Sequence, residues 1–133
     1  MIYVDTCLAI YAIEDRGARG DRARALFRNP ELQFAFSPLV MMEALVTPIR
    51  SNDSRIIDAY HRLFTGWDMI ELALDAYVRA AELRAASPGL KTVDALHLAA
   101  AQRAGCDALW TNDRRLAAAS AGLAVDVIGG SPD

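Results

Sequence analysis

The chain has 133 residues and a formal net charge of −3, with 17 acidic and 14 basic side chains. This length suits one domain with a core of its own, so we expect residues 1–133 to form a single domain. A composition that is 53% apolar and 23% charged excludes a disordered chain, and no apolar run is long enough for a membrane span. The acidic charge argues against a generally basic nucleic-acid binder. It does not exclude a nuclease whose own carboxylates are offset by a metal ion.

Neither the two cysteines nor the N-terminus indicates an oxidising compartment. Cys7 and Cys106 form no metal-type pair and no disulfide framework, and a redox pair would require the fold to bring them together. The chain begins with an apolar, strand-like segment that has no basic region and no cleavage pattern, so we read no signal peptide. We therefore expect a cytoplasmic protein.

The first half of the chain alternates short apolar runs with helical patterns. We expect strands at 2–4 and 33–36, a helix through 8–11 and an arginine-rich helix at about 21–27. Ser37 and Pro38 are a good N-cap and first helical residue for a further helix. That helix should end at about Thr47, because Pro48 follows.

The second half continues the alternation and leads to the fold class. We expect helices at 53–64, closed by Gly66, at 75–86, at 93–104 behind a Thr92 cap, and at 113–119. Strands are expected at 69–72, 108–111 and 123–128. Strands that alternate with helices predict an α/β three-layer sandwich, in which helices flank a central, mostly parallel sheet.

Four scattered carboxylates are candidate site residues, although each has a simpler explanation. Asp5 and Asp113 each follow a strand and could merely cap the next helix, and Asp94 lies in the first turn of a helix, where acidic residues favour the dipole. Glu43 lies in an apolar helix, and this composition predicts that the helix is buried. A buried carboxylate needs a partner, and that partner could be an arginine or a metal ion.

Taken together, the four carboxylates favour a metal site. Asp5 and Asp113 both lie at carboxyl ends of strands. Asp94 opens the helix that precedes the strand at 108–111. We therefore expect all four side chains to converge on one rim of the sheet. A cluster of oxygen ligands suits Mg²⁺ or Mn²⁺ rather than Zn²⁺ or iron. These ions serve phosphoryl chemistry by activating water and stabilising the attacked phosphate.

At four places the sequence resembles the PIN-domain family, and within it the VapC toxins of bacterial toxin–antitoxin modules. The segments are Tyr3-Val4-Asp5-Thr6, the lone Glu43 in its apolar helix, 93–101 (VDALHLAAA), and Thr111-Asn112-Asp113. The resemblance spans essentially the whole chain, in the right order. It implies a PIN-like fold, with Asp5, Glu43, Asp94 and Asp113 as the catalytic, metal-binding quartet and Thr6 and Thr111 as supporting hydroxyls.

The same resemblance implies an activity and partners. It implies a Mg²⁺- or Mn²⁺-dependent endoribonuclease that cleaves structured RNA, such as tRNA or rRNA, and leaves a 5′-phosphate and a 3′-hydroxyl. It also implies a homodimer and a small VapB-type antitoxin.

Several basic residues have open roles. Arg114 and Arg115 directly follow Asp113 and are candidates for phosphate contact. The arginine-rich segment 16–28 could track RNA, or it could be a solvated face. His97, one turn after Asp94, is a conceivable catalytic base, but a partly buried helix residue is the simpler interpretation.

Three rival functions make different demands on the sequence. A signalling receiver domain needs adjacent acidic residues after its first strand and a lysine after its last strand, whereas Asp5 is single and Lys91 precedes a helix. A haloacid-dehalogenase-type phosphatase needs a second aspartate where this chain has Cys7. An RNA-binding module without catalysis remains open, and it would retain RNA in the presence of a chelator.

Overall fold

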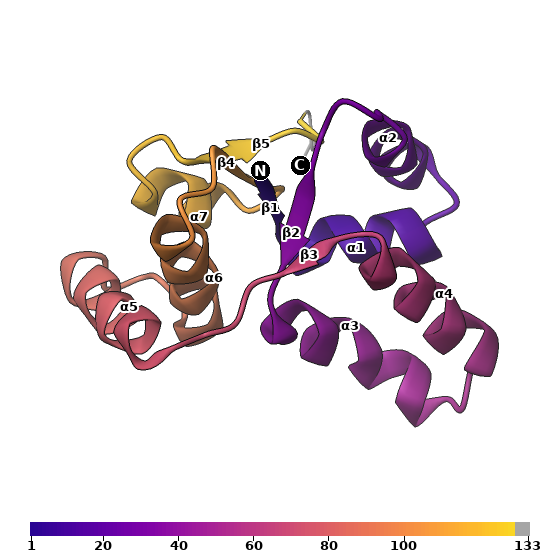
Figure 1. The fold of residues 1–133 in the computed structure, drawn as a ribbon, viewed down its shortest axis with the longest axis horizontal. Helices are drawn as coiled ribbons and strands as arrows, with labels where there is room; N and C mark the ends of the chain where they lie inside the picture. The colour runs from indigo at the N-terminus through magenta and orange to yellow at the C-terminus, as the bar shows by residue number, and fades with distance from the viewer. Residues whose placement is uncertain (130–133) are drawn as a thin grey trace.

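A parallel five-stranded sheet forms the centre of the molecule in the computed structural model, which describes residues 1–129 (Figure 1). Its strands are β1 (Ile2–Val4), β2 (Phe34–Phe36), β3 (Asp68–Met69), β4 (Ala108–Thr111) and β5 (Ala124–Asp126). The spatial order is β3-β2-β1-β4-β5, and every neighbouring pair is parallel. Because the connection from β3 to β4 crosses from one side of β1 to the other, a topological switch point lies beside β1, where α/β sheets bind their ligands.

Seven helices accompany this sheet within residues 1–129: α1 (Thr6–Glu14), α2 (Ala18–Phe27), α3 (Pro38–Arg50), α4 (Ser54–Thr65), α5 (Leu74–Ala86), α6 (Thr92–Arg103) and α7 (Arg114–Ala119). In Figure 1, α5, α6 and α7 gather on one side of the molecule, and α1, α2 and α4 lie on the other. None of these helices combines the length and apolar character that a membrane span requires. The predicted α/β class and the parallel sheet are confirmed.

The central strand β1 packs against both layers of helices. Tyr3 belongs to the larger core cluster, which is built mainly from α3 to α7, whereas Ile2 and Val4 belong to a second cluster with α1 and α2. This division follows from the alternation of side chains along a strand. Tyr3 and Val4 are completely buried, so the residue that follows them is held at a rigid position.

The structure corrects several predicted boundaries. Helix α3 does not stop before Pro48 but continues to Arg50, because Ser51 N still donates to Thr47 O at 3.1 Å and the proline ring is buried. Strand β3 has only two residues, both exposed, whereas a strand of four residues at 69–72 was predicted. Only Asp68 and Met69 pair with β2. Smaller shifts concern α2, which begins at Ala18, and β5, which covers only Ala124–Asp126.

Two further expectations concern caps and cysteines. Thr92 is the first residue of α6 and not its cap, since the N-cap position is occupied by Lys91, which makes no side-chain capping bond. Cys7 and Cys106 are both free thiols, so the fold does not join them. Burial and the neighbouring Asp5 charge raise the pKa of the Cys7 thiol to about 12, which keeps it protonated.

Candidate active site

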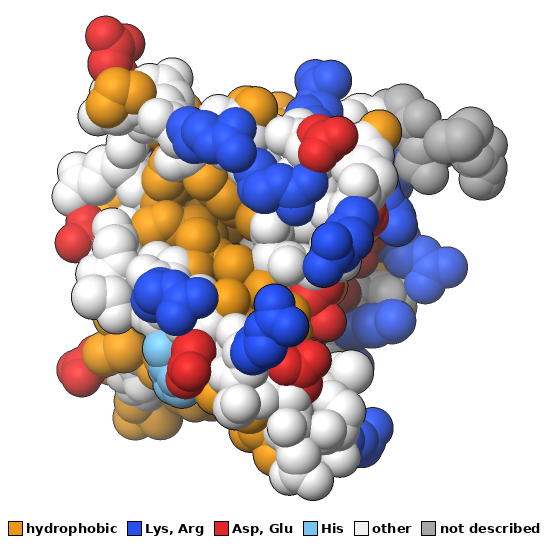
Figure 2. All heavy atoms as spheres, turned by 90° about the vertical axis from the view of Figure 1, so that its right-hand side faces the viewer, with side chains coloured by type: hydrophobic (Ala, Val, Ile, Leu, Met, Phe, Trp, Pro, Cys, Tyr) orange, Lys and Arg blue, Asp and Glu red, His pale blue; other side chains and the backbone are white. Residues whose placement is uncertain are grey.

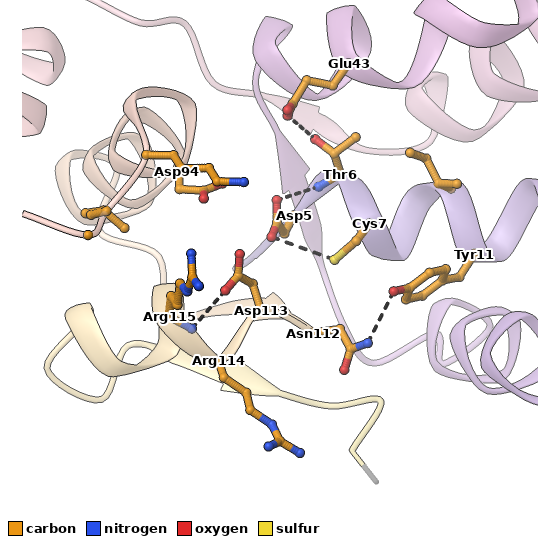
Figure 3. A pocket seen from close by; sticks show the side chains of 14 residues that line it. Asp5, Thr6, Cys7, Tyr11, Glu43, Asp94, Asn112, Asp113, Arg114 and Arg115 are labelled. Atoms are coloured by element: carbon orange, nitrogen blue, oxygen red, sulfur yellow. Dashed lines mark hydrogen bonds between the residues drawn. The ribbon is translucent and has the colours of Figure 1, made fainter. Parts of the chain in front are cut away.

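A cavity of about 670 Å³ opens beside the carboxyl end of β1, at the switch point of the sheet (Figure 3). It is lined by Asp5, Thr6, Cys7, Ile10, Tyr11, Glu43, Gly89, Leu90, Lys91, Asp94, Asn112, Asp113, Arg114 and Arg115. All four carboxylates selected from the sequence are among these residues, and so are Thr6, Arg114 and Arg115. The four chain segments that carry the predicted site therefore meet at one place.

Asp5 is the most deeply placed of the four carboxylates. It is 6% exposed and directly follows β1, where its backbone N–H donates to Trp110 O at 2.9 Å and so extends the pairing with β4. Its Oδ1 accepts a hydrogen bond from the Thr6 backbone N–H at 2.8 Å and caps α1. Its Oδ2 accepts from the Thr111 hydroxyl at 2.7 Å. Asp5 therefore both caps α1 and lines the cavity.

Asp113 lies two residues beyond the end of β4, the strand that neighbours β1. It is the N-cap of α7, and its Oδ1 accepts from the backbone N–H groups of Arg115 at 2.8 Å and Leu116 at 3.3 Å. The buried Thr111 hydroxyl, which donates to Asp5, also accepts from the Asp113 backbone N–H at 2.9 Å. Thr111 does not line the cavity, but it joins the two strand ends that carry the aspartates.

Glu43 reaches the cavity from α3. Its side chain is 35% exposed, so the prediction of a buried carboxylate was wrong; the helix leaves Met42, Val46 and Ile49 exposed on its outer side. Its Oε1 accepts from the Thr6 hydroxyl at 2.6 Å and lies 2.7 Å from His97 Nε2. Partial burial opposes ionisation, but the hydrogen bonds from His97 and Thr6 outweigh it and lower the pKa of Glu43.

Asp94 lies in the first turn of α6, as expected. Its pKa is raised, first by burial and then by the negative charges of Asp5 and Asp113, with a smaller contribution from Glu43. The carboxylates are therefore close enough to influence one another's ionisation. A divalent cation in the cavity would relieve this repulsion.

The donor set fits a hard cation, with one correction to the expected geometry. Within residues 1–129, no three histidine, cysteine or acidic side chains are arranged to hold a metal ion directly, so the expectation of carboxylates close enough to share an ion directly is not met. Mg²⁺ does not need such a cage, since it keeps several waters and binds through one or two carboxylates together with substrate phosphates. The all-oxygen lining by Asp5, Glu43, Asp94 and Asp113 suits that mode of binding.

The sequence model of the PIN domain matches residues 2–122, which is most of the chain. The chain belongs to the PIN-domain family. Ribonuclease VapC35 of Mycobacterium tuberculosis, in the strains CDC 1551 and H37Rv, is 31% identical to this PIN domain over 132 residues, covering 96% of each chain.

Solved structures resemble this PIN domain throughout its length. A toxin–antitoxin complex from Klebsiella pneumoniae superimposes with a TM-score of 0.78 at 23% identity, covering 96% of this chain and 98% of that one. Mycobacterium tuberculosis VapC20, described as a toxin that cleaves the sarcin–ricin loop, gives a TM-score of 0.75 at 23% identity, with 90% and 95% covered. VapBC2 from Rickettsia felis, bound to a DNA fragment from its promoter, gives 0.71 at 20% identity, with 94% and 98% covered. At these identities the similarity establishes the fold.

The cavity of this PIN domain also contains residues that were not selected from the sequence. Asn112 donates from Nδ2 to the Tyr11 hydroxyl at 3.2 Å, and its buried Oδ1 has no hydrogen-bond partner within residues 1–129. Lys91, the only lysine of the chain, lines the cavity as Asp94 does. A signal was available for both residues, because Asn112 lies between Thr111 and Asp113 and Lys91 lies three residues before Asp94 in the sequence.

Most of the arginine-rich segment has a structural role in this PIN domain. Arg24 donates to the carbonyl oxygens of Ala12 and Asp15, at 3.1 and 2.8 Å, and so closes the end of α1. Arg22 donates to Val127 O at 2.8 Å, and Arg19 pairs with Asp15. Of the predicted basic contacts, Arg114 and Arg115 line the cavity.

Proposed function

We propose that this chain is a Mg²⁺- or Mn²⁺-dependent endoribonuclease and the toxin of a type II toxin–antitoxin module. The observation that carries the proposal is the meeting of Asp5, Glu43, Asp94 and Asp113 in one cavity at the switch point of the sheet. The curated relative that is 31% identical over nearly the whole chain is named a ribonuclease, which supports the same activity.

The proposed reaction is hydrolysis of an RNA phosphodiester that leaves a 5′-phosphate and a 3′-hydroxyl. One or two of the carboxylates Asp5, Asp94 and Asp113 would hold the metal directly and the others through its waters, and Glu43 would bind it directly or through a water that the carboxylate orients. When bound, the metal supplies an activated water and stabilises charge on the attacked phosphate. Asp5 and Asp113 are held for this role by helix caps and by Thr111, and Glu43 by Thr6.

Lys91, Arg114 and Arg115 line the same cavity and are suited to receive the RNA backbone. These three basic residues line the cavity together with its four carboxylates. A polyanion can therefore approach a protein whose net charge is −3. Structured RNA, such as tRNA or rRNA, is the proposed substrate class, and VapC20, one of the similar structures, is described as cleaving the sarcin–ricin loop.

The proposed partners are a small VapB-type antitoxin and a second copy of the chain, and the proposed compartment is the cytoplasm. The similar structures from Klebsiella pneumoniae and Rickettsia felis are toxin–antitoxin complexes. On the face shown in Figure 2, apolar side chains gather in one area, with basic side chains above it, to its right and below it. A protein partner with an apolar stripe and acidic flanks matches such a face.

Cleavage of structured RNA by the purified chain tests the activity. With Mg²⁺ or Mn²⁺, the chain is expected to cut a tRNA pool or an rRNA hairpin and to leave 5′-phosphate ends, and EDTA should abolish cleavage. Asp94→Asn should reduce cleavage by at least about 100-fold, since the variant removes a charged metal ligand. Asp58→Asn, outside the cavity, is the matched control and should cleave like the native chain.

Two results would contradict the proposal. The first is a metal-loaded protein that cleaves no structured RNA, and the second is an Asp94→Asn variant that cleaves as well as the native chain. RNA retention that survives EDTA without any cleavage would instead identify a non-catalytic RNA-binding module.

A further inference from the structure

A line of buried polar side chains runs through the core and ends at Glu43. The Tyr3 hydroxyl lies 2.7 Å from Ser37 Oγ and 2.7 Å from His97 Nδ1. The other ring nitrogen, His97 Nε2, lies 2.7 Å from Glu43 Oε1. Tyr3, Ser37 and His97 are each completely buried. The line therefore joins β1, the start of α3 and α6 to one carboxylate of the cavity.

The directions of these hydrogen bonds follow from the donors and acceptors available. An ionised carboxylate oxygen can only accept, and Glu43 Oε1 already accepts from the Thr6 hydroxyl, so His97 Nε2 must carry a proton. In a neutral imidazole, Nδ1 is then the acceptor and Tyr3 donates to it. The Tyr3 oxygen in turn accepts from Ser37, which makes every bond of the line compatible with the next.

Ser37 shows that this line takes precedence over local helix chemistry. The residue occupies the N-cap position of α3, where a serine hydroxyl ordinarily accepts a backbone N–H of the first turn. Here Ser37 makes no side-chain capping bond, and its hydroxyl is bonded to Tyr3 instead. Apolar groups of the same shape could fill such a core, so burial alone does not account for three linked polar groups.

Glu43 is the member of the line that needs to be held. A glutamate has three rotatable side-chain bonds, and this one is 35% exposed, so it would sample several rotamers if it were not restrained. Both hydrogen bonds that Glu43 makes within residues 1–129 end on Oε1, which leaves Oε2 for a ligand. His97 Nε2 also lies 3.8 Å from Asp5 Oδ1, so the same N–H stands between two carboxylates of the site.

We propose that His97 is a positioning residue that, held in its Nε2–H tautomer by Tyr3, orients the Glu43 carboxylate for the metal ion and its water. The proposal rests on the proposed metal-dependent function, but it concerns the side chains of this chain and can be measured without RNA. It assigns His97 no direct contact with the substrate. Ligand-orienting hydrogen bonds of this kind typically change metal affinity or activity by roughly 10- to 100-fold when they are removed.

Three substitutions of His97 separate positioning from packing. Gln can place an amide N–H where Nε2 donates to Glu43, Asn retains polarity but is too short to reach Glu43, and Leu fills the space without donating. Binding of Mn²⁺ to each full-length variant is measured by electron paramagnetic resonance. His97→Leu and His97→Asn should bind Mn²⁺ roughly 10- to 100-fold more weakly than the native chain, and His97→Gln should stay within about threefold of it.

The ring itself gives a second readout. The chain has only two histidines, so a ¹⁵N spectrum of the imidazole nitrogens is readily assigned with His61→Gln as the reference. The metal-free protein should show His97 with a protonated Nε2 and an unprotonated Nδ1. Tyr3→Phe keeps the buried ring and removes only the hydroxyl. It should weaken Mn²⁺ binding by roughly 2- to 10-fold, the effect of one neutral hydrogen bond, and it provides the test if His97→Leu does not fold.

The outcomes distinguish this inference from the proposed activity. Equal Mn²⁺ affinity in the native chain and in folded His97→Leu, an unprotonated Nε2, or a His97→Gln variant no better than His97→Asn would each overturn the role of His97. If the metal-binding and tautomer results are as expected but the native chain cleaves no RNA, the ribonuclease proposal fails and the positioning role stands. Where cleavage occurs, the Mg²⁺ concentration for half-maximal rate should shift with the Mn²⁺ affinity, while KM for RNA stays unchanged.

Discussion

Single residues of the site serve the local fold and the cavity at once. Asp5 uses one carboxylate oxygen to cap α1 and the other to accept from Thr111, and Asp113 caps α7 through Oδ1. A carboxylate has about four acceptor positions, so these bonds leave capacity for a cation or its waters. The pKa of Asp94 is raised, first by burial and then by the negative charges of Asp5 and Asp113.

Asp94→Asn is expected to raise the thermal midpoint of the metal-free protein at neutral pH. Burial, Asp5 and Asp113 raise the pKa of Asp94 above its ordinary value of 3.8, so its ionisation opposes folding. This cost is fully present above the folded-state pKa and is absent below 3.8, so the difference between variant and native chain should shrink as the pH falls. Thermal melts in EDTA at several pH values measure it.

The control for this prediction is the exposed Asp58→Asn, which should change the midpoint little at any pH. Added Mg²⁺ should stabilise the native chain more than Asp94→Asn, because the variant loses one charged ligand. A metal-free Asp94→Asn protein that melts below the native chain at neutral pH would contradict the role of charge repulsion.

At the scale of elements, the junction between α1 and α2 sets the position of the helix that begins at the site. Arg24 of α2 donates to the terminal carbonyls of α1, and Gly20 of α2 packs directly on the backbone of Asp15. A Cβ built on Gly20 would lie 1.7 Å from Asp15 O, a contact that no side-chain adjustment can relieve. This close approach is a reason for a glycine inside a helix, where glycine is otherwise unfavourable.

Gly20→Ala is therefore expected to lower the free energy of unfolding by about 1–3 kcal/mol, as overpacking of a tight contact does. The helical propensity of alanine alone would change stability in the opposite direction, by about 1 kcal/mol, so the sign of the effect is informative. Gly66→Ala is the matched control, because its Cβ would meet only Leu63 O at 3.6 Å and its backbone is right-handed. Urea unfolding measures both variants, and a stabilised Gly20→Ala would show that the helices move apart easily.

At the scale of the whole molecule, net charge and local charge differ. The chain carries a net charge of −3, yet Lys91, Arg114 and Arg115 line the cavity that contains the four carboxylates. Arg115 and the neighbouring Gly89 and Leu90 also line a second hollow of about 390 Å³. Arg115 lines both hollows, so the RNA strand of the proposed reaction would pass this side chain if it extended from one hollow into the other.

Arg115→Ala is expected to raise KM for RNA by about tenfold with little change in kcat, the effect of one charge-assisted hydrogen bond to a phosphate. The difference should narrow as salt is raised from about 50 to 200 mM, because counterions screen phosphate contacts. Arg62→Ala removes an arginine that lines a separate hollow and should leave KM unchanged. Equal KM values for Arg115→Ala and the native chain at low salt would remove Arg115 from the RNA path.

The sequence by itself determined the order and type of the elements and the four segments of the site. Apolar periodicity, caps and turn residues act within a few positions of one another, and so the local pattern predicted the alternation of strands and helices. The α/β class predicted a mostly parallel sheet but no strand order, and only the structure shows that β1 pairs with β4, which places Asp5 and Asp113 at the same edge of the sheet. The Thr111 hydroxyl that joins them was predicted only through the family resemblance.

Only the tertiary structure decided which side chains hold Glu43 and how far it is exposed. Tyr3 and His97 are 94 positions apart, and Glu43 and His97 are 54 apart, so no local pattern encodes their hydrogen bonds. Helix α3 was read as buried because its composition is apolar, whereas exposure depends on which neighbours cover each face, and none of the described residues covers Met42, Val46 or Ile49 fully. Pro48 was predicted to end the helix because the cost of its missing N–H is a local effect that the sequence shows. The packing that buries its ring depends on residues far away in the sequence and could not be predicted.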